Sequence, residues 1–160
     1  MKLTSKSVLI KAPQKAVWQK LIDWHTWPTW DGGMETISFA NDSSDTSSAN
    51  NPSDAIRVGS VGKLKMKGGP AVDLRVTEFS FEKSYTSEFD LWGSRFIFIH
   101  FLETVTISGL PQVRATVAVE ADGITAPLLG QIVSYGLNKE MLGWLEKFRD
   151  LIEADGSASS

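Results

Sequence analysis

The sequence of 160 residues has no cysteine and only two histidines, His25 and His100. Without cysteine there is no disulfide framework, no thiolate metal site and no cysteine nucleophile. Two histidines far apart in the sequence, with no carboxylate pattern beside them, do not form a metal-binding motif. We therefore expect neither a metal nor another cofactor, and the lack of cysteine makes a cytoplasmic location the default prediction.

Long apolar runs and a charge excess are also absent. No run approaches the roughly 20 apolar residues of a membrane span, and the apolar stretch near the N-terminus is too short for a signal peptide. The 16 basic residues are scattered among 19 acidic ones, for a net charge of −3, which argues against nucleic-acid binding. There is no nucleophile elbow, no phosphate-binding glycine loop and no His-x-x-x-His pair, so no catalytic motif is identified.

Aromatic residues, in contrast, are abundant, with six tryptophans and eight phenylalanines. A chain of this size needs fewer rings to make a core, so we expect some of them to line a cavity. Trp24, Trp27 and Trp30 fall within seven residues, which is too many for a solvated loop. The segment 27–33 is therefore predicted to be a compact turn or a short helix.

The longest periodic stretch runs from Thr125 to Ala154 and predicts one long helix. Its apolar residues recur at the three- and four-residue steps of one helical face, namely Val133, Leu137, Met141, Trp144, Phe148, Leu151 and Ile152. Thr125 is the expected N-cap, and Pro127 falls in the first turn, where its missing donor costs nothing. We expect the helix to end before Gly156, which leaves residues 156–160 as a disordered tail.

Three glycines, Gly130, Gly136 and Gly143, interrupt this helical pattern. Each costs about 1 kcal/mol relative to alanine in a helix interior. They are explained by a close packing partner, by a space left beside the helix, or as glycines tolerated in a core helix. The sequence leaves these alternatives open.

The rest of the chain predicts an antiparallel sheet. A strand over 2–11 and a helix over 13–24 precede the tryptophan-rich turn, and the other strands are expected at 34–40, 58–67, 71–79, 84–92, 95–107 and 113–119. The polar, low-complexity segment 41–55 is predicted to be a flexible loop. Consecutive strands with short turns and one amphipathic helix to cover them indicate an α+β fold.

Several segments together resemble the START-like (SRPBCC) superfamily, in its polyketide cyclase/dehydrase-like branch. They are Val8–Trp18, the run Trp27-Pro28-Thr29-Trp30 after Asp23, the run His100-Phe101-Leu102, and Gly123. The resemblance implies one helix-grip domain over residues 1–155, with two short helices after the first strand. In that fold a curved antiparallel sheet of six or seven strands grips the long C-terminal helix around a deep cavity. It implies less about function, because the superfamily includes lipid carriers, hormone receptors, cyclases and chaperone activators.

The leading prediction is a domain that binds a small apolar, aromatic or lipid-like molecule in that cavity. The predicted ligand-binding residues are Trp30, Met34, Phe89, Phe98, His100, Tyr135, Glu140 and Trp144. His100 shares strand parity with Phe96, Phe98 and Leu102, so it faces the helix, either hydrogen-bonded in a core or as a polar contact in a cavity. Glu140 sits beside the apolar face of the helix, where it either points outward or needs a partner.

Two alternative functions stay open. The first is a cyclase or aromatase in which His100 and Glu140 move protons within the same cavity. The second is a protein-interaction module resembling the chaperone activators, which an exposed apolar patch on the sheet or near Trp24 and Trp27 would favour.

Overall fold

The computed structural model describes residues 1–39 and 56–158, so the polar segment 41–55 and the last two residues lie outside the described part. The elements, in chain order, are β1 (Lys2–Ile10), α1 (Gln14–Leu21), the 3₁₀ helix η1 (Trp24–Thr26), α2 (Trp27–Trp30), β2 (Met34–Phe39), β3 (Val61–Met66), β4 (Ala71–Ser80), β5 (Ser84–Leu91), β6 (Ser94–Ile107), β7 (Leu110–Gly123) and α3 (Ala126–Ala158).

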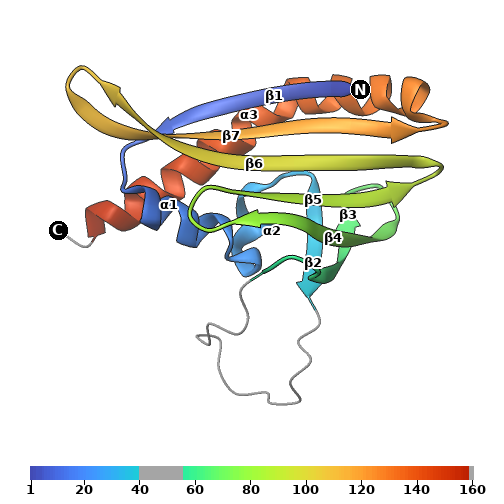
Figure 1. The fold of residues 1–160 in the computed structure, drawn as a ribbon, viewed down its shortest axis with the longest axis horizontal. Coiled ribbons are helices and arrows are strands. Elements are labelled where there is room, and N and C mark those ends of the chain that lie inside the picture. Colours follow the sequence, from blue (N-terminus) through green and yellow to red (C-terminus); the bar gives the residue numbers. More distant parts are fainter. Residues whose placement is uncertain (40–55, 159–160) are drawn as a thin grey trace, which may run out of the picture.

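Seven strands form one antiparallel sheet in the order β1-β7-β6-β5-β4-β3-β2 (Figure 1). From β2 to β7 each strand pairs with the next one along the chain, and the turns that join β3 to β7 are short, as predicted. The strand β1 instead pairs with β7, with Lys2 opposite Glu120 and Ile10 opposite Val113. The curved sheet and the long helix that it grips confirm the predicted helix-grip α+β fold.

The strand β7 is longer than its sequence pattern indicates, because it pairs with β6 from Ile107 opposite Leu110 to Ser94 opposite Gly123. Apolar alternation predicts only residues 113–119. The two ends of β7 are largely exposed, so the alternation stops while the backbone pairing continues. A turn at Ser108 and Gly109, both with positive φ of 51° and 80°, joins this long hairpin.

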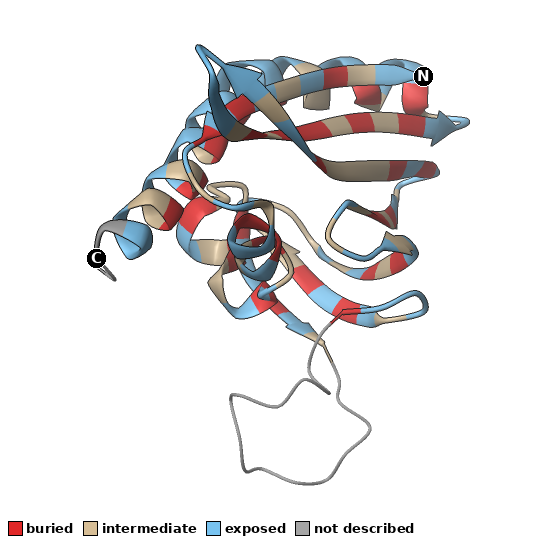
Figure 2. Cartoon of the chain, turned by 60° about the vertical axis from the view of Figure 1, so that its left-hand side comes forward, coloured by how far each residue is buried: buried red, intermediate tan, exposed pale blue. Residues whose placement is uncertain are grey.

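The helix α3 buries the predicted apolar face against the sheet. Leu137, Met141, Leu145, Phe148 and Ile152 are buried, and Val133, Trp144 and Leu151 pack against them half-buried. Buried and exposed residues alternate along the strands that face the helix (Figure 2). The core therefore lies between the concave face of the sheet and one side of α3.

The helix α3 starts where predicted, since the Thr125 carbonyl accepts the Leu129 N–H at 2.9 Å, but the role of the Thr125 side chain and the end of the helix differ from the prediction. The Thr125 hydroxyl does not cap the helix, because it donates to the Trp92 carbonyl at 2.8 Å and bonds the Ser94 hydroxyl at 2.6 Å. It thus ties the start of α3 to the turn between β5 and β6. At the other end the helix continues through Gly156 to Ala158, since one glycine costs only about 1 kcal/mol and does not by itself end a helix.

The three glycines of α3 have different surroundings. A side chain at Gly130 would contact Met1 and Leu3, so the helix lies close to β1 there. A Cβ atom at Gly136 or Gly143 would meet nothing within 4 Å, and both residues are exposed. Gly136 and Gly143 are therefore tolerated glycines on the solvent side, and no space for a ligand lies beside them.

The short helices after β1 carry three buried tryptophans, as their spacing predicts. Trp24, Trp27 and Trp30 are 9%, 3% and 5% exposed. The indole N–H of Trp27 donates to the Leu21 carbonyl at 2.7 Å, and Trp30 packs on Phe148 of α3 with ring centroids 4.7 Å apart. These residues therefore offer no apolar surface patch of the kind that would favour an interaction module.

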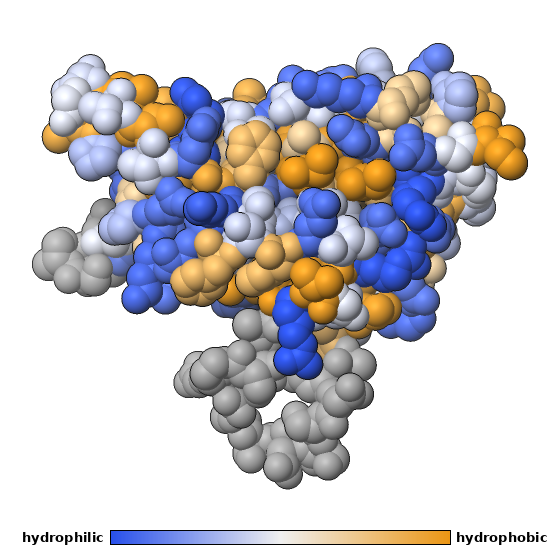
Figure 3. Space-filling model, viewed as in Figure 1, coloured by the Kyte–Doolittle hydropathy of each residue, from blue (hydrophilic) through white to orange (hydrophobic). Residues whose placement is uncertain are grey.

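The outer face of the sheet carries ion pairs. Arg75 and Arg95 both bind Asp90, at 3.0 and 2.9 Å, and Asp73 pairs with Lys63. The hydrogen bonds from the two arginines lower the pKa of Asp90. Hydrophilic and hydrophobic side chains are interspersed on this face (Figure 3).

Candidate functional site

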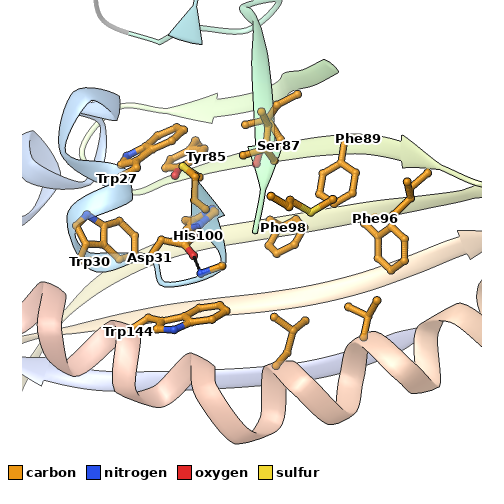
Figure 4. A pocket seen from close by; sticks show the side chains of 18 residues that line it. Trp27, Trp30, Asp31, Tyr85, Ser87, Phe89, Phe96, Phe98, His100 and Trp144 are labelled. Carbon is orange, nitrogen blue, oxygen red and sulfur yellow. Dashed lines mark hydrogen bonds between the residues drawn. The ribbon is translucent and has the colours of Figure 1, made fainter. Parts of the chain in front are cut away.

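A pocket of about 220 Å³ lies between the concave face of the sheet and α3, next to α2. Its wall comes from α2, the α2–β2 connection, the strands β2 to β6, and α3. In Figure 4 the tryptophans of α2 and Trp144 of α3 lie on opposite sides of one end of it, while Phe89, Phe96 and Phe98 lie at the other end. The strongly curved sheet creates this space, because α3 cannot contact all of the strands at once.

The α2 end of the pocket contains a stack of three rings. Tyr85 of β5 and His100 of β6 are directly opposite in the strand register, and their rings stack at 4.3 Å with 12° between the planes. Trp27 stacks on the other side of Tyr85 at 5.9 Å and 4°. This stack fixes the orientation of both polar rings.

The other end is formed around three phenylalanines. Phe89 lies opposite Phe96 in the register of β5 and β6, with ring centroids 5.5 Å apart, and Phe89 to Phe98 measures 5.7 Å. These residues alternate with outward-facing ones, so the parity of the two strands places all three rings on the concave side. Ser87, which lies opposite Phe98, adds a hydroxyl to this otherwise apolar end.

His100 lines the pocket and is half-buried. Its Nδ1 atom is buried and has no hydrogen-bond partner among the described residues. Burial lowers the pKa of His100 to about 4, because a desolvated imidazolium is disfavoured. The imidazole is therefore neutral at pH 7. Of the two surroundings that the sequence allowed, the structure shows a polar group in a pocket.

Asp31 brings a carboxylate into the same pocket from the connection between α2 and β2. Its Oδ1 atom accepts the Gly33 N–H at 3.0 Å. Burial raises the pKa of Asp31 to about 6, and the Gly33 hydrogen bond and the charge of Lys67 only partly oppose this. Near neutral pH the group is thus a half-buried, mostly ionised acid that can also take up a proton.

Two glycines hold the Asp31 connection against α3. A Cβ atom at Gly32 would collide with the indole of Trp144, and one at Gly33 would lie 3.0 Å from its Cη2 atom. Only glycine lets the backbone lie this close to the ring. Trp144 and the connection together close one side of the pocket.

Two hydroxyl groups complete the polar set. Burial, together with the charge of Asp31, raises the pKa of Tyr85 well above its ordinary value, so this hydroxyl stays protonated. Ser87 is 3% exposed and also lines the pocket. The pocket therefore combines apolar walls with an acid, a neutral histidine and two hydroxyls.

The structure brings six of the eight predicted site residues together at this pocket: Trp30, Met34, Phe89, Phe98, His100 and Trp144. Tyr135 and Glu140 are elsewhere, because both lie on the solvent side of α3. Tyr135 is 75% exposed, and Glu140 is also exposed. His100 and Glu140 therefore do not share a site, and the predicted pairing of the two for proton transfer is wrong.

Asp31 and Tyr85 were not among the predicted site residues. For Tyr85 a signal existed, since it shares strand parity with Ser87 and Phe89. For Asp31 the sequence shows only an acidic residue before two glycines, which is also typical of an exposed turn.

The described residues contain no cluster of three or more histidines, cysteines or acids that could hold a metal ion. Among the helices of residues 1–39 and 56–158, none is long and apolar enough to cross a membrane.

Comparison with protein families gives a match over residues 1–153 to the family described as polyketide cyclase/dehydrase and lipid transport. The chain belongs to this family. The polyketide cyclase-like resemblance read from the sequence is thereby confirmed. Comparison with curated proteins gives no match.

Several solved structures share the fold of this chain. One is the hypothetical protein jhp0584 from Helicobacter pylori, with a TM-score of 0.66, 16% identity and coverage of 92% of this chain and 85% of that one. Another is XoxI from Bacillus cereus, with a TM-score of 0.67, 12% identity and coverage of 93% and 94%. A third is Ara h 8.0201, with a TM-score of 0.60, 12% identity and coverage of 94% and 96%. At these identities the likeness concerns the fold alone.

Proposed function

We propose that the protein binds a small apolar or aromatic molecule, or a short lipid-like one, in the pocket between the sheet and α3. The observation that carries the proposal is the pocket itself, with its largely apolar wall. The family description, which includes lipid transport, supports it. Neutral His100 provides one polar contact that can orient a bound molecule.

The volume of the pocket suggests the size of the ligand. At about 220 Å³ it is smaller than the roughly 300–1,000 Å³ of sites for drug-sized ligands. It is larger than the roughly 150 Å³ cavity that holds benzene in an engineered protein. A compound with one or two rings is therefore the expected occupant. If it buries about 200 Å² of apolar surface, the gross gain is about 5 kcal/mol, before the cost of association.

The test uses propylbenzene as a probe and a variant that fills the pocket from α3. Leu137 lines the pocket and is buried, so Leu137→Trp should fill the space and weaken propylbenzene binding at least about tenfold. Leu142→Trp places the same ring on the exposed side of the same helix, where Leu142 is 41% exposed, and should leave binding unchanged. Binding is measured by titration calorimetry, and folding by circular dichroism.

The opposite result would remove the proposal. If the interior were closely packed in solution, the parent would give no heat with propylbenzene. The Leu137→Trp variant would then be destabilised by about 1–3 kcal/mol through overpacking. Gly136, one of the glycines for which the sequence allowed a space beside the helix, cannot serve as a filling site, because a side chain there would meet nothing within 4 Å on the exposed side of α3.

A further inference from the structure

The charge of the pocket wall is one-sided. The 18 residues that line the pocket include one carboxylate, Asp31, and no lysine or arginine. His100 adds no compensating charge, because its pKa is about 4. An anionic ligand would therefore meet a buried like charge and no cation in the wall.

Three of the four polar groups are gathered at one end, and the fourth, Ser87, lies opposite Phe98. In Figure 4, Asp31, Tyr85 and His100 lie together between the tryptophans of α2 and Trp144, away from the phenylalanine end. A ligand with an apolar part and a polar part therefore has one favourable direction in the pocket.

Each of these groups has hydrogen-bonding capacity that the described protein does not use. Asp31 accepts the Gly33 N–H through Oδ1, and its Oδ2 has no partner among the described residues. The Tyr85 hydroxyl likewise has no hydrogen bond to a described residue, and His100 Nδ1 is buried without one. The Asp31 Oδ2 atom and the Tyr85 hydroxyl are not among the fully buried atoms that lack a partner, so both keep accessible surface. A ligand hydroxyl can satisfy both kinds of group, because it donates one hydrogen bond and accepts others.

We propose that the pocket selects an uncharged ring compound that carries a hydroxyl group, and that it rejects ring compounds that carry a carboxylate. The ring lies at the phenylalanine end, and the hydroxyl lies between the Asp31 carboxylate and the Tyr85 hydroxyl. This deepens, and rests on, the proposed binding function. It names Asp31 as the residue that determines specificity.

The experiment compares two ligands of equal length, 3-phenylpropan-1-ol and 3-phenylpropanoate, by calorimetry at pH 8. The parent protein should bind the alcohol at least about tenfold more tightly than the carboxylate, because a second buried negative charge is disfavoured beside Asp31. The Asp31→Asn variant should bind 3-phenylpropanoate at least about tenfold more tightly than the parent does, while its affinity for 3-phenylpropan-1-ol should not increase. Asparagine keeps an oxygen that can accept the Gly33 N–H, so the connection retains its hydrogen bond.

A matched control removes the same charge outside the pocket. Glu146 lies on the exposed side of α3, so Glu146→Gln should leave the preference between the two ligands unchanged. If Glu146→Gln relaxed the preference as much as Asp31→Asn, net charge rather than the pocket wall would be responsible, and the proposal would be wrong.

A second measurement needs no variant. The anion 3-phenylpropane-1-sulfonate keeps its charge between pH 8 and 5.5, whereas Asp31, with a pKa of about 6, becomes mostly neutral. The charged and titratable groups that face Asp31 are Lys67, Tyr85 and His100. Of these, His100 and Tyr85 do not titrate in this range, because their pKa values are about 4 and well above 10. The sulfonate should therefore bind at least about fivefold more tightly at pH 5.5, and the alcohol should not.

The outcomes separate this inference from the binding function. If the alcohol, the carboxylate and propylbenzene all fail to bind the folded parent, the binding function itself is wrong. Propylbenzene binding without a preference for the alcohol over the carboxylate would keep the binding function and overturn the inference. A preference that survives unchanged in Asp31→Asn and at pH 5.5 would overturn it as well.

Discussion

At the scale of single residues, Asp31 shows how burial changes a common side chain. In an unfolded chain this carboxyl has an ordinary pKa of 3.8, whereas in the fold the pKa is about 6. The folded protein therefore binds a proton more readily than the unfolded chain between these values. Asp31 accordingly favours folding more as the pH falls from about 6 to 3.8, and at pH 7 its buried charge destabilises the fold.

We expect Asp31→Asn to stabilise the protein at pH 7. The raised pKa of Asp31 corresponds to a penalty of about 3 kcal/mol, so the variant should gain about 1–3 kcal/mol in the free energy of unfolding. Urea denaturation at pH 7 measures this gain. A variant less stable than the parent at pH 7 would mean that the carboxylate has a favourable partner in the fold, and that burial does not dominate its pKa.

At the scale of elements, the contact between the α2–β2 connection and α3 depends on two small residues and one large one. Gly32→Ala places a methyl group against the indole of Trp144, so we expect a loss of about 1–3 kcal/mol from overpacking. In a Trp144→Leu background, the same change should cost less, because the ring is gone. A double-mutant cycle by thermal denaturation measures the coupling.

Gly143→Ala is the matched control for this cycle. Its Cβ atom would meet nothing within 4 Å, so alanine should stabilise α3 by about 1 kcal/mol through helix propensity alone. Equal costs of Gly32→Ala with and without Trp144 would show that the connection does not pack on the ring.

The same elements show what the sequence could predict. Strand parity placed Phe89, Phe98 and His100 on the concave side, because alternation depends only on the backbone period. Side-chain directions on the helix α3 were harder to predict, because each residue along a helix turns the side-chain direction by about 100°. Glu140 is therefore exposed while its neighbour Met141 is buried. The position of Asp31 depends on how the α2–β2 connection folds against α3, and no periodic pattern in the sequence predicts that.

At the scale of the whole molecule, two buried groups act on stability in opposite directions. The pKa of His100 falls from 6.5 to about 4 on folding, so the unfolded chain takes up a proton first as the pH falls. The contribution of His100 to stability is fully present above pH 6.5 and is lost as the pH falls from 6.5 to about 4. The contribution of Asp31 to stability rises over nearly the same pH range, from about 6 down to 3.8. The two effects largely cancel in the parent protein.

Replacing one of the two groups should make the effect on stability measurable, because the two effects no longer cancel. We expect His100→Phe to become more stable relative to the parent by about 2 kcal/mol between pH 7 and pH 4.5, because the parent alone loses the histidine contribution. Chemical denaturation of both proteins across this range gives the difference, in which the other carboxyl groups cancel. A constant difference at every pH would contradict a lowered pKa for His100.

The pairing of β1 with β7 also has a consequence for how the chain is made. A ribosome releases β1 first, yet its hydrogen-bonding partners between Val113 and Glu120 emerge more than a hundred residues later. Until then the edge that β1 will fill does not exist, and α3, which covers the inner face, follows later still. Contacts between such distant segments are slow to form. During synthesis the apolar residues of β1 therefore stay uncovered until β7 and α3 have emerged, and the sheet cannot close before then.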